Sequence, residues 1–132
     1  MPPNVLLRSE QTNGAVSAIE VASSPGFAGP PLHRHDFDEA FYVIEGALTF
    51  QLGDEVFTRT AGELAFAPRA VAHAYANHSD APARALIICT PAGFERYFAR
   101  TAAERDGVDP PDWALQPIPS VTRLGPQIER RS

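Results

Sequence analysis

His33-Arg34-His35-Asp36-Phe37-Asp38-Glu39, followed by a mostly apolar run that ends at Gly46, is the stretch that decides the fold. Successive side chains of a β-strand point to opposite faces, so His33 and His35 project to the same side. Glu39 can return to that side after a bend. Imidazole nitrogen and carboxylate oxygen suit borderline divalent ions, and two histidines with one carboxylate can leave coordination positions open. The stretch therefore predicts half of a metal site.

A second stretch supplies the other half. It reads Gly62, five residues, Pro68, then His73, three residues and Asn77. His73 is the predicted fourth ligand, brought to the site from a different strand. The remaining histidine, His78, lies in a polar run with Ser79 and Asp80, which is typical of a solvated turn.

Together the two stretches resemble the motifs of the cupin family, G-x5-H-x-H-x3or4-E-x6-G and G-x5-P-x-G-x2-H-x3-N. The positions in register are His33, His35, Glu39, Gly46, Gly62, Pro68, His73 and Asn77. Two positions depart from the motifs: Phe27, flanked by Gly26 and Gly29, stands at the opening glycine, and Ala70 stands at the inner glycine of the second motif. Alanine adopts a positive φ poorly, so the Ala70 position raises the question of whether this turn needs one.

The resemblance implies an all-β fold, the cupin double-stranded β-helix or jelly-roll barrel, with a short C-terminal helix. It also implies one divalent transition-metal ion per chain (Fe, Mn, Ni, Co, Cu or Zn), held by His33, His35, Glu39 and His73. The alternative is a degenerate cupin that uses the pocket without a metal.

Length and charge narrow the class of partner. A chain of 132 residues predicts a single domain, large enough to bury one core without disulfides. The formal net charge is −5, and no basic cluster stands out beyond Arg130 and Arg131, so no nucleic-acid partner and no anionic membrane partner are expected. A small-molecule substrate is the expected partner.

The chain carries no signal for export or membrane insertion. Its N-terminal residues lack a signal peptide, and no stretch approaches the roughly 20 apolar residues of a membrane helix. The single cysteine, Cys89, lies in an apolar run, which favours a buried, inert thiol in a reducing compartment. We therefore expect a cytoplasmic protein.

Short apolar segments separated by turn signals predict many strands and few helices. The expected strands cover residues 5–8, 15–21, 41–44, 47–52, 56–60, 63–67, 71–75 and 83–90, and residues 23–32 are expected to form a loop. One cupin domain should span residues 1–132, with a barrel core at about 15–90, a helix at about 93–105 and a proline-rich tail at 106–132.

Side chains that share parity with a ligand should line the same cavity, because each barrel strand alternates inward and outward. This predicts a substrate pocket lined by Phe41, Phe50, Leu64, Phe66, Tyr75 and Ile87. Plain core packing is the alternative for each of them, and a register error of one residue would send any of them to the outer face.

Two further segments, Thr90-Pro91-Ala92-Gly93-Phe94-Glu95 and Leu124-Gly125-Pro126, are similar to those of the quercetin or flavonol 2,3-dioxygenase-like group of small cupins. This resemblance implies a mononuclear metal-dependent dioxygenase that acts on a small aromatic or enolisable substrate of polyphenol or polyketide type. Glu39 would be a metal ligand or a general base, and Tyr75 would donate a hydrogen bond to a substrate oxygen.

Other functions stay open. A Lewis-acid metal centre would suit an isomerase or a cyclase, and a cupin can also bind a small ligand as a sensor without turnover. We also expect a homodimer, because the N-terminal segments have no obvious partner, exposed sheet edges are usually covered, and the resemblance includes dimeric cupins.

Overall fold

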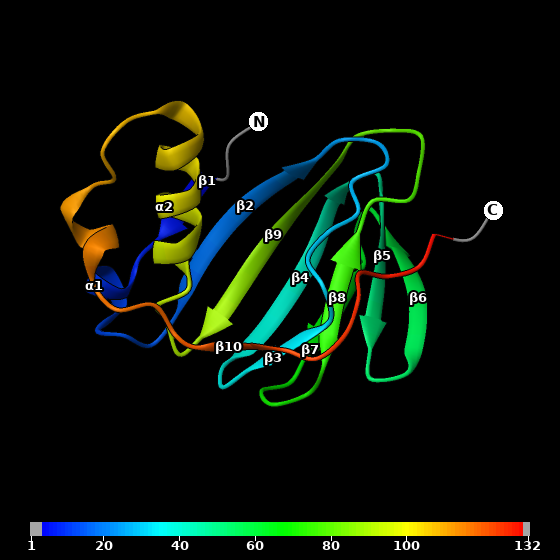
Figure 1. Cartoon of the computed structure of the whole chain (residues 1–132), viewed down its shortest axis with the longest axis horizontal. Helices are drawn as coiled ribbons and strands as arrows, with labels where there is room; N and C mark the ends of the chain where they lie inside the picture. Colours follow the sequence, from blue (N-terminus) through cyan, green and yellow to red (C-terminus); the bar gives the residue numbers. More distant parts are fainter. Residues whose placement is uncertain (1–3, 131–132) are drawn as a thin grey trace.

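The short apolar segments form ten strands in a computed structural model, which describes residues 4–130 (Figure 1). The first three and the last two residues of the expected 1–132 domain lie outside the described residues. The strands make two five-stranded antiparallel sheets that enclose one core, with a helix at one end. The expected double-stranded β-helix with a C-terminal helix is thereby confirmed.

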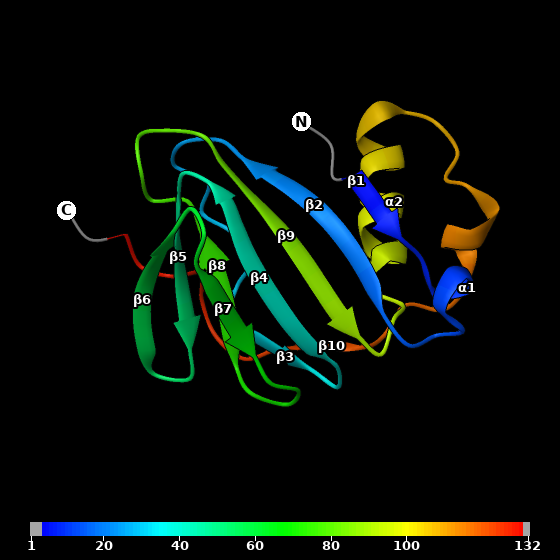
Figure 2. The ribbon, with the colours of Figure 1, turned by 180° about the vertical axis from the view of Figure 1, so that it is seen from behind.

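The first sheet has the strand order β1-β2-β9-β4-β7. Its strands are β1 (Asn4–Leu7), β2 (Ser17–Ser23), β9 (Ala83–Thr90), β4 (Asp38–Glu45) and β7 (Leu64–Ala67). The long central strands alternate strictly between buried and partly exposed residues, which is the pattern of a sheet with one face on a core. Figure 2 shows this sheet from behind.

The second sheet has the order β10-β3-β8-β5-β6. Its strands are β10 (Val121–Arg123), β3 (His33–His35), β8 (His73–Ala76), β5 (Ala47–Leu52) and β6 (Glu55–Thr60). Strands β3 and β8 meet at one Cα pair, His33 with His73. The two stretches singled out from the sequence therefore lie side by side at the centre of this sheet.

The core between the sheets is built from the inward residues of both. Ile19 and Ile87 of the first sheet and Leu48 and Phe50 of the second are at most 3 % exposed and belong to one cluster. Several inward positions of β7 and β9 are alanines, which leave room for the larger rings opposite them.

Three helical segments gather at one end of the barrel: α1 (Ser9–Thr12), α2 (Glu95–Asp106) and the 3₁₀ helix η1 (Asp112–Leu115) (Figure 1). The buried carboxylate of Glu95 joins α1 to the start of α2, since it accepts hydrogen bonds from the backbone N–H and the hydroxyl of Ser9 and from the backbone N–H of Gly93. These bonds fix the start of α2 against the barrel end.

The tail after α2 does not leave the barrel. Strand β10 pairs with β3 at the edge of the second sheet and extends it, and the chain after β10 then passes over β8, where Ile128 packs against Ala74 and Ala76 (Figure 1). The backbone N–H of Leu32 donates to Pro126, and the backbone N–H of Leu124 donates to Leu32. Within residues 4–130, no helix is long and apolar enough to cross a membrane.

Candidate metal centre

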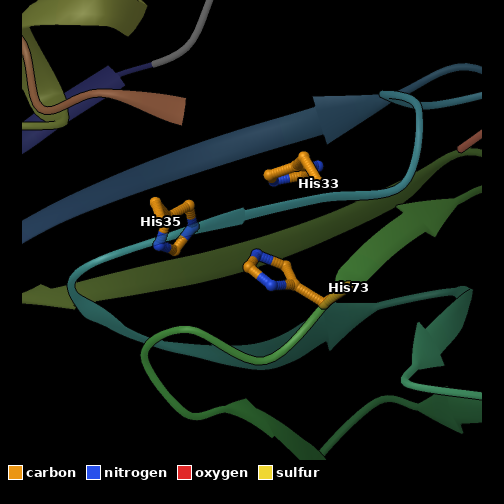
Figure 3. A group of neighbouring side chains, drawn as sticks. All are labelled: His33, His35 and His73. Carbon is orange, nitrogen blue, oxygen red and sulfur yellow. The ribbon is translucent and has the colours of Figure 1, made fainter. Parts of the chain in front are cut away.

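Three histidines from two strands converge at the centre of the second sheet (Figure 3). His33 and His35 lie on β3, and His73 begins β8. Ring nitrogens of the three lie within 4.8 Å of one another, and each residue is at most 9 % exposed. Buried imidazoles so close together need a shared positive partner or protons to satisfy their inward nitrogens.

A backbone carbonyl fixes the orientation of each ring. The Nδ1 of His33 lies 2.7 Å from the oxygen of Pro31, and the Nδ1 of His73 lies 3.0 Å from the oxygen of Val71. The Nδ1 of His35 lies 3.0 Å from the oxygen of Phe37. A carbonyl oxygen can only accept, so each Nδ1 carries a proton and each neutral ring turns a lone pair on Nε2 toward the centre.

Glu39, on β4, brings a carboxylate to two of these nitrogens. Its Oε1 lies 3.0 Å from the Nε2 of His35 and 3.1 Å from the Nε2 of His73. Lone pairs that face each other at this distance repel unless a proton or a metal cation lies between them. The donor set therefore fits a cation, and its mixture of imidazole and carboxylate suits a transition metal.

The ionisation of these groups reflects the same arrangement. Burial acts to raise the pKa of Glu39, but hydrogen bonds and positive charge from His35 and His73 outweigh it, and the pKa is lowered. Burial acts to lower the pKa of His73, but the hydrogen bond and charge of Glu39 raise it overall. For His33, burial prevails and lowers the pKa. Glu39 is therefore ionised, and its carboxylate contacts the imidazole nitrogens of His35 and His73.

The turn between β7 and β8 is hydrogen-bonded to the strand that carries His33 and His35. Ala70 has a φ of 66°, so the turn does need the positive φ that the motif's glycine would supply. Its backbone N–H donates to the carbonyl of His35 at 2.8 Å, which ties the turn to a ligand strand. An alanine in this conformation costs about 1–2 kcal/mol.

We expect Ala70→Gly to stabilise the protein by ~0.5–1 kcal/mol, because relief of the backbone strain exceeds the entropy that glycine adds to the unfolded chain. Urea unfolding of the metal-free protein measures this change. Ala72→Gly is the matched control, since Ala72 is not among the described residues with positive φ, and it should lose stability. Equal losses in both variants would contradict the assignment of strain to Ala70.

A cavity of about 830 Å³ opens beside the histidines. Phe41 and Tyr75, two of the predicted pocket residues, line it together with His33, His73 and Glu39. Burial and the nearby charge of Glu39 raise the pKa of the Tyr75 phenol, so the hydroxyl remains protonated and can donate a hydrogen bond.

The other predicted pocket residues lie elsewhere, and for these the structure corrects the prediction. Phe50 and Ile87 are buried in the core and do not line the cavity. Leu64 and Phe66 are 50 % and 48 % exposed on the outer face of the first sheet. Their partners in the β4–β7 register are Tyr42 and Ala40, and residues directly opposite each other share a face, so the inward positions of β7 belong to alanines.

The sequence prediction missed one wall of the cavity. It is formed by Phe94 just before α2, by one face of α2 and by β10, and its members are Phe94, Tyr97, Phe98, Thr101, Arg105, Val121 and Arg123. The helical members recur at spacings of three and four, a signal that marks one face of a helix but not what that face covers. The three residues of β10 in the proline-rich tail show no periodicity.

Asn77, the last residue of the second motif, is fully buried and structural. Its side chain donates to the carbonyls of Ser23 and Ala81 and accepts from Ser79, which fixes the turn that contains His78. His78 lies outside the group of three histidines.

Comparison with known proteins agrees with this architecture. A protein-family model described as a cupin domain matches residues 20–89. No curated protein sequence matches the chain. Among solved structures, TT1209 from Thermus thermophilus has a TM-score of 0.61 and 27 % sequence identity, over 69 % of this chain and 83 % of that one.

Two other similar structures carry descriptive names. The polyketide cyclase RemF from Streptomyces resistomycificus has a TM-score of 0.59 and 23 % identity, over 67 % of this chain and 63 % of its own. The DMSP lyase DddQ from Ruegeria pomeroyi has a TM-score of 0.53 and 24 % identity, over 58 % of this chain and 39 % of its own. At these identities the likeness concerns the fold alone.

Proposed function

The chain belongs to the cupin family, and from that premise we propose that it is a metal-dependent enzyme, a dioxygenase acting on a small aromatic or enolisable substrate. The observation that carries the proposal is the convergence of three buried imidazoles, each with Nδ1 fixed by a backbone carbonyl, beside a cavity that His33 and His73 line. The similarity of residues 90–95 and 124–126 to the flavonol-dioxygenase-like cupins favours this reaction.

The proposed ligands are His33, His35, His73 and Glu39. A bound divalent transition metal would supply Lewis acidity and coordination positions open to a substrate oxygen and to dioxygen. Phe41 and the aromatic rings at and after the start of α2 give the space beside it apolar walls. The described chain thus contributes a polar floor and apolar walls, the usual form of a small-molecule site.

Two side chains can act on the substrate directly. Glu39 is held as a carboxylate, so if it leaves the metal it can accept a proton from an enol or a phenol. Tyr75 lines the same cavity and its hydroxyl stays protonated, so it can donate a hydrogen bond to a substrate oxygen as negative charge develops there.

An oxygen electrode tests the reaction. The chain is reconstituted separately with Fe, Mn, Co, Ni, Cu and Zn and mixed with flavonols and polyphenolic ketones, while products are followed by mass spectrometry. We expect oxygen uptake matched by substrate loss with at least one redox-active metal, and a smaller rate in Tyr75→Phe. Tight binding without any product would contradict the enzyme and favour a sensor.

A Lewis-acid reaction is the second candidate. The observation that favours it is the pairing of a potential base, Glu39, with a neutral donor, Tyr75, around one metal site, since isomerisation and cyclisation need such a pair. The names of two similar structures, a polyketide cyclase and a lyase, point to the same class. Product formation without oxygen uptake in the same experiment would select this reaction.

We also expect a homodimer. Tyr42, Leu64 and Phe66 are 42 %, 50 % and 48 % exposed and lie together on the outer face of the first sheet, at its β7 edge. Contiguous exposed apolar side chains at a sheet edge favour association. Light scattering at micromolar concentration should give the mass of two chains.

The double substitution Leu64→Glu with Phe66→Glu should shift that mass toward the monomer, whereas Val56→Glu on β6 of the other sheet should not. A monomer mass for the unmodified chain would remove this expectation.

A further inference from the structure

Among the charged side chains that line the cavity, positive ones outnumber negative ones. Apart from the histidines, the charged residues in its lining are Glu39, which contacts His35 and His73, and two arginines, Arg105 and Arg123. The chain as a whole carries a net charge of −5. An acidic protein therefore presents guanidinium groups to its cavity, which favours an anionic ligand.

Arg123 is placed next to the metal centre by strand register. In the β10–β3 pair, Arg123 lies opposite His33, Val121 lies opposite His35, and Thr122 lies opposite Arg34. Residues directly opposite each other in an antiparallel pair project to the same face. Consistent with this, Val121 and Arg123 line the cavity whereas Thr122 does not.

The guanidinium of Arg123 is not engaged within the described part of the chain. Carboxylates there pair with Arg69, Arg84 and Arg96, but Arg123 forms neither an ion pair nor a side-chain hydrogen bond with residues 4–130. A guanidinium offers five donors in a planar fork that matches a carboxylate. Arg123 thus has unused donors beside the proposed site of reaction.

The rest of the wall suits an aromatic body. Phe94 and Tyr97 stack with ring centroids 5.1 Å apart, and Phe98 meets Phe94 edge to face at 5.3 Å. All three rings line the cavity, Phe94 from the residue before α2 and Tyr97 and Phe98 from α2 itself. A flat apolar ligand can lie along them while a polar group at its end reaches the sheet.

We propose that the substrate of this site is a small aromatic or enolisable carboxylate, whose carboxylate group is bound by Arg123 beside His33. This inference names the substrate class of the function proposed above and rests on it. Arg123 acts by binding and orienting the ligand, so its loss should weaken binding of anions and leave neutral ligands unaffected.

Calorimetric titration with 1-naphthoate and 1-naphthamide, which share a body and differ in charge, tests this inference. The full chain is titrated as purified and after chelator treatment, at about pH 8, where ordinary imidazole is neutral. In both states we expect about tenfold tighter binding of the naphthoate, the difference that a charge-assisted pair brings. Arg123→Ala should abolish this preference and leave naphthamide binding intact, which also shows that the variant is folded.

Arg123→Lys should keep part of the preference, because the charge remains while the fork is lost. Arg34→Ala is the matched control: it removes the same charge from the neighbouring strand, but from an exposed position on the opposite face, and the preference should persist. Equal affinities of naphthoate and naphthamide for the unmodified chain would overturn the proposal. A preference for naphthoate that survives Arg123→Ala in chelator-treated protein would also overturn it. So would a preference that is lost in Arg105→Ala but not in Arg123→Ala. Because the chelated arm needs no metal, its outcome is independent of metal loading and of turnover.

Discussion

His73→Ala should abolish stable metal binding. His33 and His35 come from one short strand, and His73 alone joins them from β8, so its loss leaves two imidazoles and Glu39. Changes to residues that merely orient a ligand already weaken metal binding by about 10–100-fold, so removal of a ligand should raise the dissociation constant for Zn or Ni by more than about 100-fold. Competition with a chromogenic chelator measures this constant.

His78→Ala is the matched control for that experiment. It removes an imidazole from the turn after Asn77, outside the group of three histidines, and should leave metal affinity unchanged. If His73→Ala keeps the affinity of the unmodified chain, the second motif does not contribute to a metal site and the proposed function fails with it.

Acid should remove the stabilisation that the metal provides. Protons compete with the metal for imidazole nitrogen, and a ligand that binds only the folded chain stabilises it by about 2.7 kcal/mol at a hundred times its dissociation constant. We therefore expect the melting temperature of metal-loaded protein to exceed that of metal-free protein near neutral pH, and this difference to shrink as pH falls through about 6.

The metal-free protein should respond to pH in a different way. Because the pKa of His73 is raised above its ordinary value of 6.5, its ion pair with Glu39 adds stability that is complete below 6.5 and is lost as pH rises through the higher folded pKa. The lowered pKa of His33 acts in the opposite direction, since its protonation in acid costs stability. The lowered pKa of Glu39 means that its contribution is lost only in stronger acid.

Melting curves of both forms between about pH 8 and pH 5 separate these effects. In His73→Ala the difference between metal-loaded and metal-free protein should be small at every pH. A difference in the unmodified chain that stays constant with acid would contradict metal coordination by imidazole.

Local sequence patterns predicted an all-β chain and the pairing of His33 with His35, whereas the resemblance to the two cupin motifs specified the barrel and joined His73 to that pair. His33 and His35 share a face through strand alternation alone, and Gly46 directly follows the strand that carries Glu39. The helix after residue 93 follows in the same way from the spacing of its aromatic residues.

The cavity walls depend on features that no local pattern contains. A turn separates β6 from Leu64, so the inward and outward positions of β7 cannot be counted along the chain from the metal ligands. That count placed Leu64 and Phe66 on the wrong face of the sheet. Arg123 reaches the cavity because a three-residue strand pairs with the edge of β3, and such pairing depends on the folded tail rather than on the composition of that segment.

The central claim is that His33, His35, His73 and Glu39 hold a metal, and elemental analysis of the purified protein tests it most directly. We predict about one transition-metal ion per chain, either as purified or after incubation with Fe, Mn, Co, Ni, Cu or Zn and removal of excess ion. Metal content well below one ion per chain that none of these ions restores, in protein that melts cooperatively, would contradict the claim.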